Sequence, residues 1–257
     1  AAAPDGATCA EGGPRLCKTR GPAGRRTVRM TPGKRALDVV VSLGLLGLLW
    51  PVMACIAALV LLCDGRPVFF GARRMGAPNR PFTMWKFRTM RPHPADCGVT
   101  GGDKSRRITP LGRLLRRSRL DELPQLWNVI RGEMSLVGPR PPAPEHVACA
   151  PRVFTRVLAA RPGITGLATL MLHGREARIL SACTTPVLTE AAYRCHCLPW
   201  KTRVDLLYLR HRSLAWDLWL LLATLLRGLP PRGPLRRFPF VNLSGRKRAA
   251  RRRPRPV

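Results

Sequence analysis

Two adjacent carboxylates, Asp121 and Glu122, have the side chains best suited to chemistry in this sequence. Acidic residues are rare here, since 14 Asp and Glu stand against 45 Lys and Arg, so a neighbouring pair is informative. One carboxylate can act as a covalent nucleophile on phosphorus. The other can hold Mg²⁺, which prefers oxygen ligands and bridges phosphate oxygens. Taken alone, such a pair beside several arginines is more often a surface ion-pair cluster.

The segment Gly138-Pro139-Arg140-Pro141 follows the pair closely in the chain. Prolines fix the backbone on both sides of Arg140, and an arginine held in this way suits phosphate binding. Arginines also neutralise the charge that develops on a phosphoryl group during its transfer. An ordinary turn is the alternative for this segment alone. The sequence contains neither a P-loop nor a G-x-G-x-x-G fingerprint, so no standard nucleotide cradle is predicted.

The net charge of +31 indicates an anionic partner, and nucleic acid, acidic lipid head groups or phosphorylated substrates would all serve. A membrane-anchored nucleic-acid binder would leave Asp121-Glu122 unexplained, and it would need aromatic residues interleaved with the basic ones. Nucleic acid is therefore not the expected partner. The nine cysteines are scattered, and Cys195-His196-Cys197 fits no common zinc site. Free thiols in a reducing compartment are predicted.

Residues 36–63 are almost wholly apolar, with Asp38 as the one charged side chain. A straight helix of this length reaches roughly 42 Å, more than a bilayer core needs. Pro51 in its middle predicts a kink, and basic residues on both flanks favour keeping both ends in the cytoplasm. We therefore predict a re-entrant helix that bends at Pro51. A tilted spanning helix is the alternative.

Composition divides the chain into four parts. Residues 1–33 and 229–257 have no apolar period and are predicted to be a disordered basic leader and tail, the tail suited to anionic membrane lipids. Residues 34–64 form the membrane helix, and residues 65–228 form a catalytic domain that ends in an interfacial helix too short to span. The strands expected in this domain are Val68–Phe70 and Phe82–Phe87, and the helices are Leu111–Arg117, Leu123–Ile130, Arg152–Ala160 and Leu214–Leu226.

Short motifs follow one another in order between residues 32 and 226. They are Lys34-Arg35-x-x-Asp38, Lys86-Phe87-Arg88-Thr89-Met90, Arg107-Ile108-Thr109-x-x-Gly112-x-x-Leu115-Arg116, Leu120-Asp121-Glu122-Leu123-Pro124-Gln125-Leu126, Asn128, Gly132 through Pro141, Arg161-Pro162-Gly163-Ile164-Thr165-Gly166, and Asp205-x-x-Tyr208 with Ser213 and Asp217. Each motif is weak alone. As an ordered set they resemble the bacterial sugar transferases, also called monotopic phosphoglycosyl transferases.

The resemblance implies a monotopic protein of the bacterial inner membrane: a small, helix-rich α/β catalytic domain on the cytoplasmic face, carried by a re-entrant, Pro-kinked helix and interfacial amphipathic helices. It implies that Asp121 attacks the sugar-bearing phosphate of a UDP-sugar and that UMP leaves. Undecaprenyl phosphate then takes the phosphosugar, which initiates exopolysaccharide, capsule or glycan synthesis. Glu122 is implied as the Mg²⁺ ligand. The substrate-binding positions implied are Lys86, Arg88, Arg116, Arg140, Arg161 and Asp205.

This sequence departs from the family pattern at three places. Trp50-Pro51 replaces the usual Ser-Pro, so proline still supplies the kink but the serine hydroxyl is missing. Ser105 stands where the family usually has Asp, and Asp103 is a candidate substitute; Thr169 replaces a usual Gln. An inactive homologue that acts as a membrane scaffold therefore stays open. The sugar and the question of a homo-oligomer are not determined by the sequence.

Overall fold

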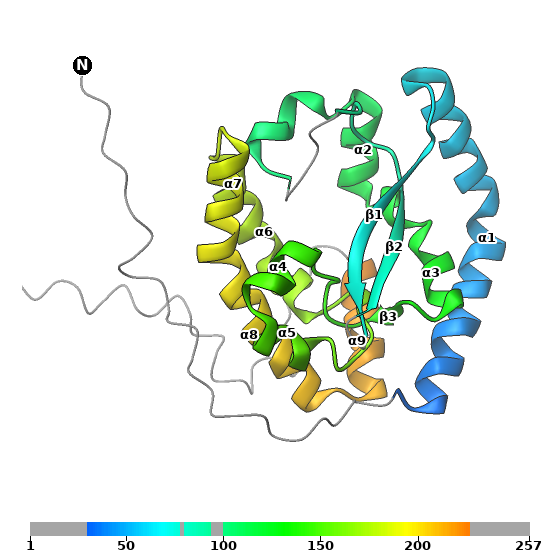
Figure 1. The fold of residues 1–257 in the computed structure, drawn as a ribbon. Coiled ribbons are helices and arrows are strands. Elements are labelled where there is room, and N and C mark those ends of the chain that lie inside the picture. The colour runs from blue at the N-terminus through cyan, green and yellow to red at the C-terminus, as the bar shows by residue number, and fades with distance from the viewer. Residues whose placement is uncertain (1–29, 78–79, 94–99, 227–257) are drawn as a thin grey trace, which may run out of the picture.

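The structure, a computed structural model, describes residues 30–77, 80–93 and 100–226, and Figure 1 shows their arrangement. Residues 1–29 of the predicted leader and the whole predicted tail, 229–257, lie outside the described residues. The helices are α1 (Pro32–Asp64), α2 (Pro110–Ser118), α3 (Gln125–Arg131), α4 (Pro144–Cys149), α5 (Pro151–Val157), α6 (Leu167–Ser181), α7 (Pro186–Ala192), α8 (Leu198–His211) and α9 (Leu214–Leu225). The strands are β1 (Phe69–Gly76), β2 (Arg80–Phe87), β3 (Ser135–Val137) and β4 (Gly163–Thr165), and the short helical segments are η1 (Gly102–Arg107), η2 (Leu120–Glu122) and η3 (Tyr193–Cys197).

The helix-rich character expected from the sequence is confirmed, as are the helices now called α2, α3, α5 and α9. The strand expected at Val68–Phe70 is longer and reaches Gly76. It pairs antiparallel with β2, so that Phe70 lies opposite Lys86. β3 and β4 form a separate parallel pair. The longer helices α6 and α8 were not expected, and both contribute to the site described below.

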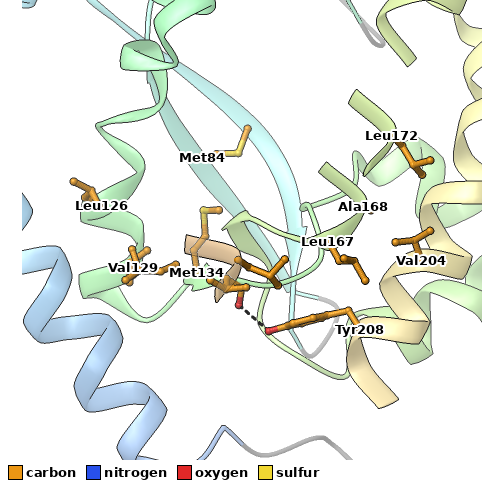
Figure 2. Close-up of a cluster of buried hydrophobic side chains, with 12 residues drawn as sticks. Met84, Leu126, Val129, Met134, Leu167, Ala168, Leu172, Val204 and Tyr208 are labelled. Atoms are coloured by element: carbon orange, nitrogen blue, oxygen red, sulfur yellow. Dashed lines mark hydrogen bonds between the residues drawn. The ribbon is translucent and has the colours of Figure 1, made fainter. Parts of the chain in front are cut away.

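Apolar side chains from β2, α3, β3, α6, α8 and α9 meet in the main core (Figure 2). Val129 and Leu220 are fully buried there. Tyr208 reaches into this core from α8 and donates to the carbonyl oxygen of Val137 at 3.4 Å and to Asp217 Oδ1 at 2.6 Å. Burying these apolar surfaces supplies the main driving force that holds the helices around the short strands.

The Lys34-Arg35-x-x-Asp38 motif fastens the first turns of α1 to the domain. Lys34 Nζ donates to Asp217 Oδ2 on α9 at 2.6 Å. The guanidinium of Arg35 donates to the carbonyl oxygens of Val129 and Ile130 at 2.6 and 2.8 Å, which satisfies the last turn of α3. Asp38, with only 1% of its surface exposed, accepts from Ser135 Oγ at 2.7 Å.

The other end of α1 is held by the same domain. Arg88, predicted to bind substrate, donates to the carbonyl oxygens of Asp64, the last residue of α1, and of Gly65 and Arg66, which follow it. Ile56 and Val60 on α1 pack with Phe87 and Leu115 in a smaller core. Thr109 Oγ1 donates to Asp64 Oδ2 at 2.9 Å. Both ends of α1 are therefore attached to one folded unit.

α1 is long and apolar enough to cross a membrane, and it is the one such helix among the residues described. Large apolar side chains on its surface are exposed, Leu48 by 72% and Leu62 by 81%. This composition suits a membrane anchor. The helix continues through Pro51, and Figure 1 places its two ends at opposite ends of the domain, so the expected return at Pro51 is not visible here.

α9 has the two-sided character expected of an interfacial helix. Asp217 and Leu220 face the protein and are buried, whereas Leu218 and Leu222 are about half exposed. Ser213 begins the helix by accepting from the backbone N–H of Trp216 at 3.2 Å. The exposed leucines leave an apolar stripe on its outer side.

Candidate active site

A tight turn between α2 and α3 places Asp121 and Glu122 inside the protein. α2 ends at Ser118, and Arg119 adopts a left-handed conformation with φ 62°, which costs roughly 1 kcal/mol for a residue with a Cβ. The chain then makes the single turn η2, which holds both carboxylates. Their exposed fractions are only 6% and 7%, so the pair is not the surface ion-pair cluster that such a sequence more often forms.

α2 itself is positioned by close contact with the strand region that precedes it. Gly112 lies against the backbone of Thr89, and a Cβ on this glycine would overlap the Thr89 carbonyl oxygen. Thr109 caps the helix by accepting from Gly112 N at 2.9 Å. These contacts bring Arg116 to Thr89, where its Nε donates to Thr89 Oγ1 at 2.9 Å.

The Gly-Pro-Arg-Pro segment is held by the parallel pair β3–β4. Gly138 N donates to Thr165 O at 2.9 Å, and Gly163 N donates to Pro139 O at 2.8 Å. Side chains at Gly138 or Gly163 would overlap the facing backbone, so glycine is required for this approach. The segment is therefore a fixed support that directs Arg140 toward the carboxylates.

Glu122 is the centre of a buried charge cluster. Its Oε1 accepts from Lys86 Nζ at 2.7 Å and from Arg140 Nη2 at 2.9 Å, and Arg119 Nη1 lies 3.8 Å from Oε2. Burial by itself would raise the pKa of Glu122, but Arg140 and Lys86 outweigh it and hold that pKa well below its usual range. Glu122 is therefore charged and links the strand β2 to the Arg140 segment.

Asp121 lies in a different environment from its neighbour. Its Oδ1 is buried, and no described residue donates a hydrogen bond to it. Burial raises the pKa of Asp121, with Lys86 acting against the shift and Glu122 adding to it. A poorly solvated carboxylate oxygen close to several cations is suited to attack an electrophile that those cations hold.

Both carboxylates line a cavity of about 580 Å³, which is of the size that holds a small organic ligand. Four of the predicted substrate-binding residues line the same cavity: Lys86, Arg116, Arg140 and Asp205. Asp205 comes from α8, and burial raises its pKa to about 7, with Lys201 opposing the shift. The site thus combines a cationic end with a carboxyl group that titrates near neutral pH.

The structure does not bring Arg88 or Arg161 to this cavity. Arg88 lies beneath the end of α1, as described above. Arg161 lies near the opposite end of α1, where its Nη1 is 3.7 Å from Met30 Sδ. Burial and the neighbouring Arg35 lower the pKa of Arg161.

Several cavity residues were not singled out from the sequence. Lys201 and Glu176, on α8 and α6, form an ion pair at 2.9 Å. His146 and Tyr193 form a ring pair with centroids 4.7 Å apart. Arg74 of β1 also faces the cavity. Lys201 is four residues from Asp205 and so lies on the same helix face, and this spacing could have identified Lys201 from the sequence.

The positions that depart from the family pattern are also placed. Ser105 and Thr169 line the cavity. Asp103 does not; its Oδ1 accepts from Thr189 Oγ1 at 2.8 Å and so joins η1 to α7. Asp103 therefore makes a structural contact between two helices and does not take the place of Ser105 at the cavity.

The carboxylates of the cavity determine whether the site fits a magnesium ion. Within the described ranges, no group of three or more His, Cys, Asp and Glu side chains could hold a metal. Asp121 and Glu122 fit Mg²⁺ only together with substrate oxygens, which matches the usual binding of Mg²⁺ by one or two carboxylates plus phosphate. Cys195 and Cys197 lie in η3, and burial raises the pKa of Cys197 to about 11, which disfavours a thiolate ligand.

Comparison with known proteins relates the chain to sugar transferases. The family model described as bacterial sugar transferase matches residues 29–230. A "UDP-glucose:undecaprenyl-phosphate glucose-1-phosphate transferase" of Xanthomonas campestris pv. campestris is 38% identical over 197 residues, which is 74% of this chain and 37% of that protein. A "UDP-N-acetylgalactosamine-undecaprenyl-phosphate N-acetylgalactosaminephosphotransferase" of Aeromonas hydrophila is 36% identical over 148 residues, 56% of this chain and 35% of that protein.

A third relative is shorter. The "Exopolysaccharide production protein ExoY" of Sinorhizobium fredii is 37% identical over 151 residues, 52% of this chain and 66% of that protein. The chain spans well under half the length of the two longer relatives.

Proposed function

Because the chain belongs to the bacterial sugar transferase family, we propose that it transfers a sugar-1-phosphate from a UDP-sugar to undecaprenyl phosphate. The observation that carries this proposal is the different surroundings of two neighbouring carboxylates in one cavity. Glu122 is neutralised by Lys86 and Arg140, whereas Asp121 has an oxygen without a donor among the described residues. The printed names of the relatives support the general reaction.

In the first step, an oxygen of Asp121 forms a bond to the phosphorus that carries the sugar. The bond from that phosphorus to the oxygen shared with the nucleoside-side phosphate breaks, and its electron pair leaves with UMP. The phosphosugar stays on Asp121 as an acyl phosphate. Because Asp121 is poorly solvated, its attack does not require the removal of a full hydration shell.

In the second step, an oxygen of undecaprenyl phosphate attacks the same phosphorus. The bond to the Asp121 oxygen breaks, and its electron pair restores the carboxylate. The product is an undecaprenyl-diphosphate sugar. Splitting the transfer in this way lets two substrates of very different polarity use one site in turn.

The cations of the cavity act on the charge of the phosphates. Lys86, Arg116 and Arg140 line the same space as Asp121, and their positive charge stabilises the transferring phosphoryl group. When bound, Mg²⁺ supplies further positive charge to the diphosphate oxygens, and Glu122 is the residue that would hold it.

The same proposal places the protein on the cytoplasmic face of the bacterial inner membrane. Both ends of α1 are attached to one domain, and basic residues flank both ends, which supports the proposal that both ends lie on the same side of the bilayer. A straight crossing would draw part of the domain into the lipid. Single cysteines placed before and after α1, in a chain whose nine native cysteines are replaced, are expected to react with an impermeant thiol reagent from the same side. Labelling from opposite sides would rule out re-entry.

The proposed reaction is tested with the purified full chain, undecaprenyl phosphate and a panel of UDP-sugars that includes UDP-glucose and UDP-N-acetylgalactosamine. UMP release that requires the lipid phosphate for repeated turnover is expected with at least one sugar. No release with any sugar would favour the scaffold alternative. Specific binding to RNA or DNA that persists at high salt would favour the nucleic-acid alternative.

A further inference from the structure

Arg74 is a cavity residue whose charge is not used by any contact described so far. It lies on β1 opposite Phe82 of β2 and lines the same cavity as Asp121. Its Nε is buried, and no described residue accepts a hydrogen bond from it. A buried donor without an acceptor costs free energy, so this position favours a ligand that supplies one.

The protein holds Arg74 next to a second arginine. Met75 N donates to Pro142 O at 3.0 Å, and this bond joins β1 to the segment that carries Arg140. Burial lowers the pKa of Arg74, and Arg140 lowers it further, while Tyr193 and Glu145 act in the opposite direction. Two like charges in a buried wall are stabilised by an anion between them.

Three other cations of the cavity have carboxylate partners. Lys86 and Arg140 share Glu122, and Lys201 is paired with Glu176. For Arg74, no carboxylate within ion-pair distance occurs in the described part of the chain. Among the described cations of the cavity, Arg74 is thus one whose charge is available to a substrate phosphate.

The residues that line the cavity beside Arg74 indicate whether it binds a phosphate of the nucleotide or of the lipid. The rings of His146 on α4 and Tyr193 in η3 lie 34° from parallel, and both line the cavity. Glu190 Oε1 lies 2.9 Å from His146 Nε2 and fixes that ring. These rings pack against each other and are buried, so they form a firm wall of the cavity beside an arginine, a setting that suits a nucleoside and its phosphate.

The position of His146 and Tyr193 in the domain favours the nucleotide over the lipid substrate. In Figure 1, α4, α7 and α8 lie on the side of the domain opposite to α1, the apolar helix. A phosphate on a membrane lipid would enter from the α1 side. A soluble nucleotide can occupy the far side.

We propose that Arg74 binds the nucleoside-side phosphate of the UDP-sugar, beside a nucleoside subsite walled by His146 and Tyr193. The inference rests on the proposed function. In the first step of that reaction, negative charge develops on the departing UMP, and Arg74 neutralises it. Arg74 is then a residue for binding and release of the nucleotide, not for transfer to the lipid.

The test compares Arg74→Met with Arg73→Met in the full chain. Arg73 is the neighbouring residue of the same strand, points to the other face and is exposed, so it is a matched control. Arg74→Met is expected to weaken UMP binding about 10- to 100-fold, as loss of a charged hydrogen bond does, and to leave binding of uridine within about 2-fold. Arg73→Met should bind both as the unchanged protein does. Equilibrium dialysis in detergent measures both ligands.

A second measurement separates the nucleotide from the lipid phosphate. The covalent adduct is formed at high UDP-sugar concentration, freed of nucleotide and mixed with undecaprenyl phosphate. Discharge at an unchanged rate is expected in Arg74→Met. Slowed discharge with unchanged UMP binding would assign Arg74 to the lipid phosphate and overturn the inference.

Two further results complete the test. Arg74→Lys keeps the charge without the planar fork, so its UMP affinity should lie between those of the unchanged protein and Arg74→Met. If Arg74→Met does not fold, Arg74→Lys against the unchanged protein decides: equal UMP affinity overturns the inference. Unchanged UMP binding in both variants refutes the role of Arg74 alone, whereas a wild-type chain that neither binds nor releases UMP refutes the proposed function.

Discussion

Asp121→Asn should abolish the covalent phosphosugar adduct and lower UMP release by about 10³-fold or more, because an amide oxygen cannot replace the attacking carboxylate. The side chain keeps its size, so the cavity keeps its shape. Mass spectrometry of the protein after incubation with UDP-sugar measures the adduct, and release of UMP measures turnover. Asp121→Ala should behave in the same way.

A matched control for this change is Asp103→Asn. Asp103 does not line the cavity, and the asparagine oxygen can still accept from Thr189 Oγ1. UMP release should therefore stay close to that of the unchanged protein. Full activity in Asp121→Asn, or an adduct found on a different residue, would refute Asp121 as the nucleophile.

Glu122→Gln is expected to lower turnover about 10²- to 10³-fold, the loss typical for one preorganised electrostatic group in an active site. The change leaves Lys86 and Arg140 without the carboxylate that they share. Their charges then repel each other inside a buried wall. The concentration of Mg²⁺ needed for half-maximal UMP release should rise in this variant, because Glu122 is the proposed ligand.

Glu133→Gln is the control for loss of a carboxylate as such. Glu133 lies outside the cavity and accepts from Asn128 Nδ2 at 2.6 Å. It should leave the Mg²⁺ dependence unchanged. An Mg²⁺ dependence equal to that of the unchanged protein in Glu122→Gln would overturn the metal assignment, while its loss of turnover would still support the charge role.

The cavity-lining helices α6 and α8 were a part of the fold that the sequence did not predict. On α8 the buried positions include Lys201, Thr202 and Asp205, and on α6 His173 and Glu176 face the cavity. A helix that presents polar side chains to an internal site has no continuous apolar stripe, so a search for the 3.6-residue period does not find it. α2 and α9 begin at the cap residues Thr109 and Ser213, and both were predicted.

Some motif residues have structural contacts that sequence order alone does not reveal. Arg88 belongs to the motif that also holds Lys86, yet Lys86 contacts Glu122 and Arg88 binds the carbonyl oxygens at the end of α1. Arg88 lies just beyond the end of β2 at Phe87, so the strand alternation that would place it on the same face as Lys86 no longer applies. Lys34 and Asp38 likewise fasten α1 to the domain through Asp217 and Ser135.

The sequence by itself determined the candidate carboxylate pair Asp121-Glu122, the apolar helix and the family, because these depend on residue types and local order. Only the tertiary structure decided that Glu122 is neutralised by Lys86 and Arg140 while Asp121 keeps an oxygen without a donor among the described residues. It also decided that Arg74 of β1 faces the cavity beside Arg140. Charge, burial and hydrogen bonding depend on which side chains meet, and these side chains come from segments far apart in the chain.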